Sequence, residues 1–359
     1  MKKLLIIFCA CLLLLCLFTL GFTVTQHTSV FSFTKKAFGW TANSPNFTTT
    51  AKACVVMEQA SGRVLFEKNS AERLPMASTT KIVTALTVIN NANLDDVVTI
   101  PNQACAIEGS SIYLRAGEKL TVRELLYGLM LRSGNDCATA LALHVGGSIE
   151  HFAELMNQTA QNFGCANSNF VNPHGLHDAN HYTTARDLAV ITCNALCNEH
   201  FADIVATKSA KIANDGYDYP RVLTNKNKLL INYDDANGVK TGYTKKAGRC
   251  FVGSATRNGM QVVVVVLNCG PMFEETAQML DVAFDNYQKV CIVPKSKLCG
   301  AVYKNGKATY YYCNEDYSYP ITQGERLSRK ICLTEDEQVL EVLVNDVVIK
   351  RMQLFPMDC

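Results

Sequence analysis

The stretch 75–90, PMASTTKIVTALTVIN, is the part of the sequence around which the rest of the chain is organised. Ile82, Ala85, Leu86 and Ile89 recur at the spacing of one helical face. Threonine, valine and alanine fill most of the other positions, so we predict a helix that is buried nearly all round.

The same stretch carries a candidate nucleophile and a candidate base. Ser78 precedes Lys81 by three residues, and residues i and i+3 share one face of a helix. A serine hydroxyl attacks only when a neighbouring base takes its proton, and a lysine in an apolar, partly dehydrated site has a lowered pKa and can do so. The S-x-x-K pattern alone is weak, because it recurs at 32–35 and because a serine at a helix start is commonly only a cap.

A second motif, Ser133-Gly134-Asn135, lies on a predicted tight turn. The turn separates an apolar helix at 118–131 from a second apolar helix, for which Asn135 and Asp136 are the predicted cap. A turn between two buried helices holds its side chains on a rigid frame, as a functional site requires. The simpler interpretation is a helix break with an N-cap.

A third motif, Lys240-Thr241-Gly242, is predicted on or just before the first strand of an antiparallel set. The strands at 248–256 and 261–268 follow, with a hairpin turn at 257–259, and the composition of QVVVVVLN is that of a central strand. Gly242 would allow another backbone or a substrate to approach closely. The simpler interpretation is a strand start with an exposed lysine.

Composition bounds the class of protein. The chain has 359 residues, enough for about two domains, with 48% hydrophobic and 18% charged residues, which is typical of a globular protein. The net charge of +2 gives no indication of nucleic-acid binding. Zinc-type cysteine pairs, a P-loop and G-x-G-x-x-G are missing from the sequence, so we expect no metal and no cofactor.

The cysteines are predicted to be mostly free and buried. Three of the 16 fall in the first 25 residues, and the others are scattered singly along a chain too long for a disulfide scaffold. This pattern favours small buried thiols over a bridged framework.

We predict four segments. Residues 1–25 have a basic start and a long apolar run, so they are either a cleaved signal peptide or an uncleaved membrane anchor that leaves the body of the protein outside. Residues 26–50 form a linker, 51–291 the catalytic domain, and 294–356 a small domain of strands with hairpin signals at 305–306 and 345–346.

The three motifs, in this order and each at the end of an apolar element, resemble those of the penicillin-recognising serine acyl-transferases. The chain is most similar to the D-alanyl-D-alanine carboxypeptidases, the low-molecular-mass penicillin-binding proteins; GSSIYLRAGE, LMLRSGNDCATALA, NPHGL and GVKTGYTKKAGRC carry the resemblance further. It implies an α/β fold of the β-lactamase/transpeptidase type, with an antiparallel sheet and a helical cluster, followed by a small all-β domain.

The resemblance also implies catalytic roles. Ser78 attacks the carbonyl of the penultimate D-alanine and becomes the acyl-ester, and Lys81 takes the serine proton. Ser133 relays a proton to the leaving D-alanine. Water then releases the shortened peptide, with no cofactor.

Five positions are implied in substrate binding. Asn135 hydrogen-bonds the substrate backbone, Lys240 and Thr241 hold its terminal carboxylate, Gly242 belongs to the same strand, and the backbone N–H groups of Ser78 and Tyr243 form the oxyanion hole. The implied partners are peptidoglycan stem peptides, β-lactams and, if the leader stays attached, the membrane, with no nucleic acid. One departure from the family is that Cys269-Gly270-Pro271 follows QVVVVVLN, where an arginine is expected.

Three alternatives remain open at this stage. A class A β-lactamase would need a glutamate on the loop after the second motif, and residues 163–198 contain none. An endopeptidase that cuts cross-links has the same motifs. A catalytically silent envelope binding protein would keep the fold without the reaction.

Overall fold

The computed structural model describes residues 47–304, 307–334 and 337–357. The predicted leader and most of the predicted linker therefore lie outside the described residues. The first part of the described chain contains the following elements in order: β1 (Ala53–Glu58), β2 (Val64–Lys68), η1 (Ala77–Thr80), α2 (Lys81–Asn91), β3 (Val97–Thr99), η2 (Asn102–Ala104), β4 (Lys119–Thr121), α3 (Val122–Leu131), α4 (Asn135–Gly146), α5 (Ile149–Asn162), α6 (Ala185–Ala195), α7 (Glu199–Ala206), β5 (Ser209–Ile212), β6 (Arg221–Thr224), α8 (Leu229–Asn232), β7 (Ala236–Thr244), β8 (Gly248–Arg257), β9 (Met260–Leu267) and α9 (Met272–Asn286).

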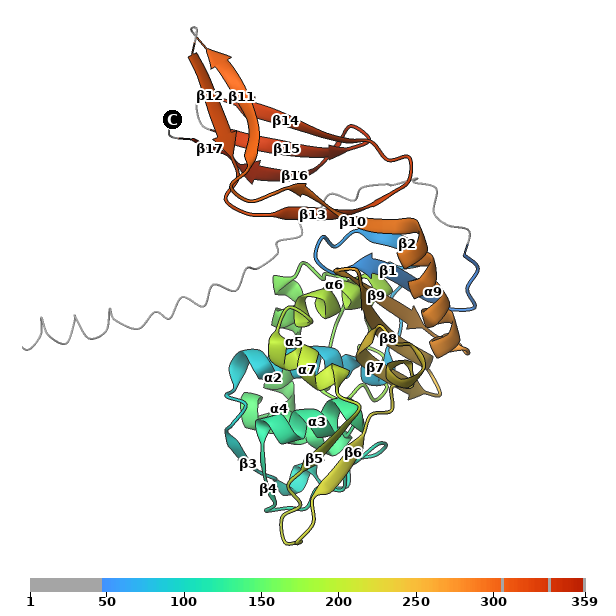
Figure 1. Cartoon of the computed structure of the whole chain (residues 1–359). Helices are drawn as coiled ribbons and strands as arrows, with labels where there is room; N and C mark the ends of the chain where they lie inside the picture. The colour runs from blue at the N-terminus through green and yellow to red at the C-terminus, as the bar shows by residue number, and fades with distance from the viewer. Residues whose placement is uncertain (1–46, 305–306, 335–336, 358–359) are drawn as a thin grey trace, which may run out of the picture. The chain divides into compact units, whose positions relative to one another are not determined.

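An antiparallel sheet in the order β2-β1-β9-β8-β7 is the frame of this part (Figure 1). The valine run of β9 is the central strand, as predicted, and it pairs with both β1 and β8. Asn258 and Gly259 have positive φ and form the predicted hairpin turn between β8 and β9. Strand β7, which carries Lys240, is an edge strand of the described sheet.

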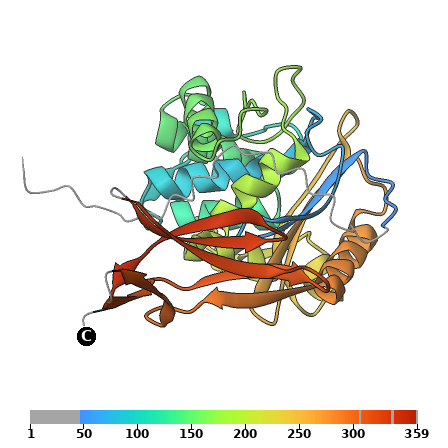
Figure 2. The ribbon, with the colours of Figure 1, turned by 90° about the horizontal axis from the view of Figure 1, so that it is seen from above.

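Both faces of the sheet are covered, which explains why β9 is apolar at every position from Val262 to Leu267. In Figure 2 the orange helix α9 lies on one side of the sheet, and the cyan and green helices lie on the other. Val263 and Val265 face the larger core, which α2 to α7 complete; Val262, Val264 and Val266 face a second core that α9 closes.

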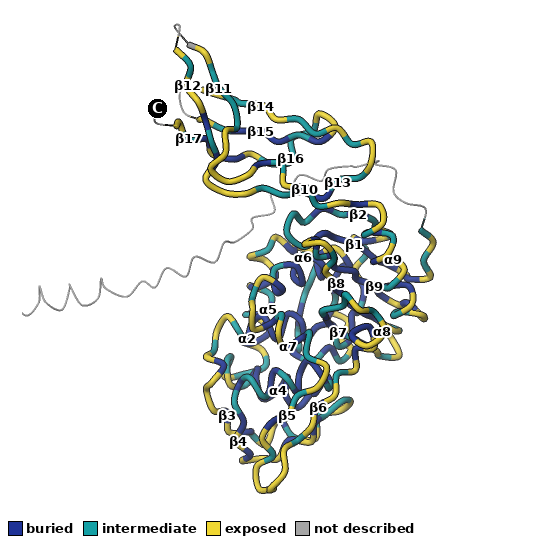
Figure 3. Tube along the Cα trace, viewed as in Figure 1, coloured by how far each residue is buried: buried dark blue, intermediate teal, exposed yellow. Residues whose placement is uncertain are grey.

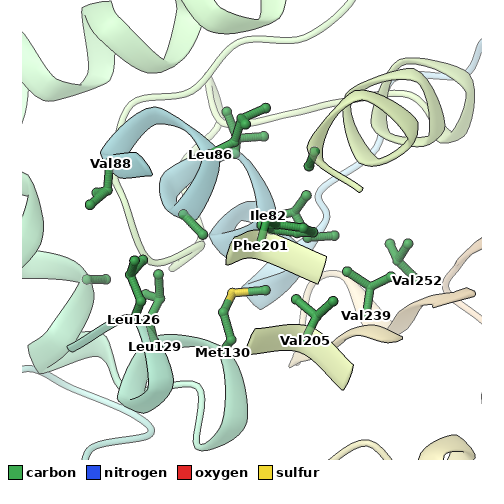
Figure 4. Packing of buried hydrophobic residues seen from close by; sticks show 14 of the residues in the cluster. Ile82, Leu86, Val88, Leu126, Leu129, Met130, Phe201, Val205, Val239 and Val252 are labelled. Carbon is green, nitrogen blue, oxygen red and sulfur yellow. The ribbon is translucent and has the colours of Figure 1, made fainter. Parts of the chain in front are cut away.

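The helix predicted around Ile82 is confirmed in the middle of the larger core. Residues Lys81 to Val88 of α2 are all buried, as the dark tube in Figure 3 shows. Figure 4 shows Ile82 and Leu86 of α2 in the same packed cluster as Leu126 of α3 and Phe201 of α7. Ser78 lies in the short 3-10 turn η1 that leads into α2, so the α-helix starts at Lys81, later than predicted.

Two predicted helix starts were wrong. Residues 119–121 form strand β4, paired with β3, and α3 begins only at Val122. Thr121 and Glu124 form a capping box that fixes this start. At the second motif, Gly134 is the N-cap and Asn135 is already helical, so Asn135 and Asp136 are not the cap.

The Asp136 carboxylate instead holds a preceding loop. It accepts hydrogen bonds from the backbone N–H groups of Ile112 and Leu114 at 3.0 and 3.1 Å and from the Ser111 hydroxyl at 2.6 Å. The loop is thereby fixed against the start of α4, next to Asn135. Thr184 caps α6 by accepting from the backbone N–H of Asp187 at 3.0 Å.

The described residues after α9 form only strands: β10 (Tyr287–Val293), β11 (Leu298–Lys304), β12 (Lys307–Tyr312), β13 (Tyr317–Thr322), β14 (Leu327–Leu333), β15 (Gln338–Val344), β16 (Val347–Gln353) and β17 (Phe355–Pro356). They have their own apolar core around Val293, Leu340 and Val342. Asn345 and Asp346 make the predicted turn with positive φ, whereas 305–306 lies outside the described residues. The predicted fold class, an α/β part followed by a small all-β part, is confirmed.

Within the described residues, no helix combines the length and the apolar character needed to cross a bilayer.

Candidate active site

Ser78 and Lys81 meet as the i, i+3 spacing predicted. The Lys81 Nζ lies 3.1 Å from the Ser78 Oγ, and the Ser78 hydroxyl lies 3.4 Å from the backbone carbonyl of His174. Ser78 is partly exposed, whereas Lys81 is fully buried. A substrate can therefore reach the hydroxyl, while water has little access to the amine.

The Lys81 amine is held by three oxygen atoms. Besides Ser78, it donates to Asn135 Oδ1 at 2.7 Å and to the His174 carbonyl at 2.7 Å. Asn135 is fixed in turn because its Nδ2 donates to the backbone carbonyl of Glu108 at 2.5 Å. The first two motifs thus converge on one buried amine.

Burial sets the protonation of Lys81. Desolvation lowers its pKa well below the ordinary lysine value, and the nearby positive charge of Lys240 lowers it further. No buried carboxylate contacts the amine in the described part of the chain; its partners are the neutral oxygens given above. The 3.1 Å contact is short enough for proton transfer from the Ser78 hydroxyl to a neutral amine at this position.

The third motif reaches the site because Gly242 has no side chain. A Cβ on Gly242 would lie 3.0 Å from the Ser78 backbone nitrogen, 3.1 Å from the Met76 carbonyl and 3.1 Å from the Thr79 nitrogen. Strand β7 therefore packs directly on η1, which brings the predicted substrate-binding strand against the candidate nucleophile Ser78. Of the neighbouring residues, Thr241 is half-buried and Tyr243 is 65% exposed.

Lys240 is not the exposed lysine of the simpler interpretation. It is 1% exposed, and its amine donates to the Thr241 carbonyl at 3.0 Å. Burial lowers its pKa to about 7, and the charge of Lys226 contributes to this shift. The ammonium has three donors, and one of them is used by the Thr241 carbonyl.

Ser133 lies at the turn two residues before Asn135, the residue whose side chain contacts Lys81. It is 4% exposed and has a positive φ of 63° at the turn before Asn135, a conformation uncommon for a residue other than glycine. Within the described residues its hydroxyl forms no hydrogen bond with Lys81 or Lys240.

Two residues that contact the Ser78–Lys81 segment were not predicted as site residues. The carbonyl of His174 contacts both Ser78 and Lys81, and Gly175, at φ +85°, packs on the Ala77 carbonyl so tightly that a Cβ there would clash. The sequence shows Asn172-Pro173-His174-Gly175 as a turn-rich loop. Every residue has a backbone carbonyl, so the residue type does not indicate which carbonyl lies at the site. Lys226, hydrogen-bonded to the Ser110 hydroxyl at 2.9 Å, adds a third amine near the site.

The described residues contain no group of three or more His, Cys, Asp or Glu side chains that could hold a metal ion. The site combines a partly exposed hydroxyl, a desolvated amine within hydrogen-bond distance of it, and a second buried amine on the adjacent edge strand. This is the arrangement expected of a serine acyl-transferring hydrolase.

Comparison with known proteins identifies the family. Residues 39–270 match Peptidase_S11, described as D-alanyl-D-alanine carboxypeptidase. The chain belongs to this family of serine-type carboxypeptidases.

Individual relatives agree with this assignment. The chain is 35% identical over 269 residues to D-alanyl-D-alanine carboxypeptidase DacF of Bacillus subtilis, a match that covers 72% of this chain and 69% of the relative. The D-alanyl-D-alanine carboxypeptidase of Streptomyces sp. K15 is 38% identical over 236 residues, covering 61% of this chain and 81% of the relative. Among solved structures, penicillin binding protein 5 from Haemophilus influenzae matches 87% of this chain and 98% of its own, with a TM-score of 0.75 and 26% identity.

Proposed function

We propose that this protein removes the terminal D-alanine from peptidoglycan stem peptides that end in D-Ala-D-Ala, through an acyl-ester on Ser78. The observation that carries the proposal is the 3.1 Å contact between the Ser78 hydroxyl and the buried amine of Lys81. Lys81 takes the hydroxyl proton as Ser78 Oγ attacks the carbonyl carbon of the penultimate D-alanine. The Ser78–carbonyl bond forms, the peptide bond breaks, and D-alanine leaves with the added proton on its amine.

Substrate recognition is proposed for β7. The buried Lys240 ammonium and the Thr241 hydroxyl bind the terminal carboxylate, while the Asn135 side chain orients the substrate backbone. The backbone N–H groups of Ser78 and Tyr243 stabilise the oxyanion, and removal of one such donor typically costs about 3–4 kcal/mol. Gly242 supports this arrangement because it lets β7 lie directly on η1.

Ser133 is proposed as the proton carrier to the leaving D-alanine amine. Its position at the strained turn before Asn135 and its near-complete burial support this role. In the free protein its hydroxyl is not bonded to either lysine, so the relay would form only when the substrate bridges the groups.

Penicillin is proposed as a slow acylating inhibitor of Ser78 and not as a substrate. The loop after the second motif contributes the His174 carbonyl, which contacts the Ser78 hydroxyl. Residues 163–198 contain no glutamate that could activate a deacylating water. The protein is proposed to act outside the cytoplasmic membrane, in the cell wall, attached by the 1–25 segment or released from it.

The decisive experiment measures free D-alanine released from a diacyl-Lys-D-Ala-D-Ala peptide. We expect release by the wild-type protein and none by Ser78→Ala. A cross-linked muropeptide, offered in parallel, separates an endopeptidase from a carboxypeptidase. Failure of the wild-type protein to release D-alanine, while penicillin still labels Ser78, would overturn the proposed reaction and leave only binding.

A further inference from the structure

Two cysteines of the all-β part lie in direct contact. The Cys299 Sγ is 3.7 Å from the Cys313 Sγ, although the two residues are 14 positions apart in the chain. The twelve described cysteines are all free thiols, and among them this is the only pair of sulfur atoms in hydrogen-bond contact. We propose that Cys299 and Cys313 form a dithiol site that is oxidised to an intramolecular disulfide by a disulfide-bearing oxidant.

The backbone brings the two residues together at a β-bulge. Strand β11 pairs with β12 through Leu298 opposite Tyr312 and Gly300 opposite Tyr311, so Cys299 is the extra residue of a bulge. The Ser296 N–H donates to the Cys313 carbonyl at 2.8 Å and ties the start of β11 to the end of β12. Cys299 therefore has no opposite residue in the ladder, and besides Cys313 its thiol contacts the Lys297 carbonyl at 3.6 Å.

The exposure of the two thiols differs in the way that ordered oxidation requires. Cys299 is partly exposed, whereas Cys313 is completely buried in the core of the strands. Burial, together with the neighbouring Cys299, raises the pKa of Cys313 to about 12. An oxidant thus meets Cys299 first, and Cys313 is protected from outside reagents.

The reaction is a balanced thiol–disulfide exchange. The Cys299 thiolate attacks one sulfur of a low-molecular-weight disulfide, its S–S bond breaks, and one thiol leaves. Cys313 then loses its proton and attacks the Cys299 sulfur of the mixed disulfide, which releases the second thiol. Two protein thiols and one disulfide become one protein disulfide and two small thiols.

Closing the bond must bring the sulfurs from 3.7 Å to the S–S bond length of about 2.05 Å. Rotation about the Cys299 side-chain bond and adjustment of the bulge provide this movement. The product would link β11 to the end of β12 and constrain the unfolded chain, so the all-β part should resist thermal unfolding better in the oxidised protein.

The experiment exposes the native full-length protein to oxidised glutathione, blocks the remaining thiols with N-ethylmaleimide in denaturant and digests with trypsin without reductant. The cuts place Cys299 in fragment 298–304 and Cys313 in fragment 308–326. We expect these two fragments to be linked and to separate on reduction. A wild-type protein that carries glutathione on Cys299 and a maleimide on Cys313 would overturn the proposal.

The test is independent of the proposed function, because no activity is measured. Three variants control for effects on folding. In Cys313→Ala the glutathione adduct on Cys299 should accumulate at least about tenfold over the wild type, since the competing intramolecular step is lost. Cys332→Ser, which removes a partly exposed thiol on β14, should leave the 298–304 to 308–326 link unchanged. A link that persists to another cysteine in Cys299→Ser would contradict the assignment.

Discussion

The position that a Cβ would take on Gly242 lies 3.0 Å from the backbone nitrogen of Ser78. This contact joins the edge strand β7 to the turn η1 and places the two ends of the proposed substrate site against each other. Because the neighbouring atoms are backbone, they cannot rotate away as a side chain could.

Gly242→Ala tests this contact. The added methyl group should push β7 away from η1, and acylation of Ser78 by a labelled penicillin should slow by about 10- to 100-fold, since small misplacements of reacting groups have effects of this size. Gly270→Ala is the matched control, because a Cβ there meets nothing within 4 Å and its φ is not in the left-handed region. Equal acylation rates in the two variants would show that the close approach does not matter.

Ser78→Ala should abolish covalent penicillin labelling and D-alanine release while the thermal unfolding midpoint changes little, because the partly exposed hydroxyl contributes few packing contacts. The other S-x-x-K serine provides the control: Ser32→Ala should label like the wild type. Penicillin labelling that survives in Ser78→Ala would show that another residue is the nucleophile.

Asn135→Asp should change the pH dependence of acylation. The substitution keeps the shape of the side chain but puts a carboxylate 2.7 Å from the Lys81 amine, which raises the pKa of that lysine and holds its proton. We expect acylation at neutral pH to fall by at least about tenfold and to recover partly as the pH rises. Stopped-flow acylation across the pH range measures this; a uniform loss at all pH values would instead indicate a purely steric effect.

The two lysines predict a bell-shaped profile of kcat/KM for D-alanine release. Burial lowers the pKa of Lys81, which must be neutral to act as a base, so activity falls as the pH drops through that pKa. Burial lowers the pKa of Lys240 to about 7, and Lys240 must be charged to bind the carboxylate, so KM should rise as the pH increases beyond about 7. In Lys240→Arg the guanidinium stays charged, so the alkaline limb should disappear even if the overall rate is lower. An alkaline limb that stays in place would assign it to another group.

Glu325→Ala should destabilise the protein. The Glu325 carboxylate accepts from both terminal nitrogens of Arg63, at 2.5 and 2.9 Å, and both side chains are only 5% exposed. Removing one member of a buried ion pair typically costs about 3–5 kcal/mol. Arg63 keeps its hydrogen bond to the Pro320 carbonyl and its contacts with the Tyr287 and Tyr319 rings, so we expect a loss toward the lower end of this range. Chemical denaturation measures the loss. Glu72→Ala, which removes an exposed ion pair with Lys52, is the control and should change stability by no more than about 1 kcal/mol.

The sequence by itself determined the elements with a strong local signal. The buried helix after Ser78 follows from an apolar pattern with no polar face, the central strand β9 from its valine run, and the turns at Asn258 and Asn345 from residues that tolerate positive φ. The reach of Lys81 to Ser78 is also local, because the i, i+3 spacing fixes it. Where local signals compete, prediction failed: the capping box of Thr121 and Glu124 delays α3 after a short strand, and Asp136 binds a loop instead of capping α4.

Only the tertiary structure decided the state of the two amines. Lysine is charged and exposed by default, and nothing in the letters around Lys240 indicates that it is 1% exposed or that its charge lies near Lys81. The carbonyls of His174 and Glu108, which hold Lys81 and Asn135, belong to the backbone and could come from any residue type. Desolvation and backbone hydrogen bonds depend on which distant segments pack together, and that information is spread over the whole chain and is not present in any one motif.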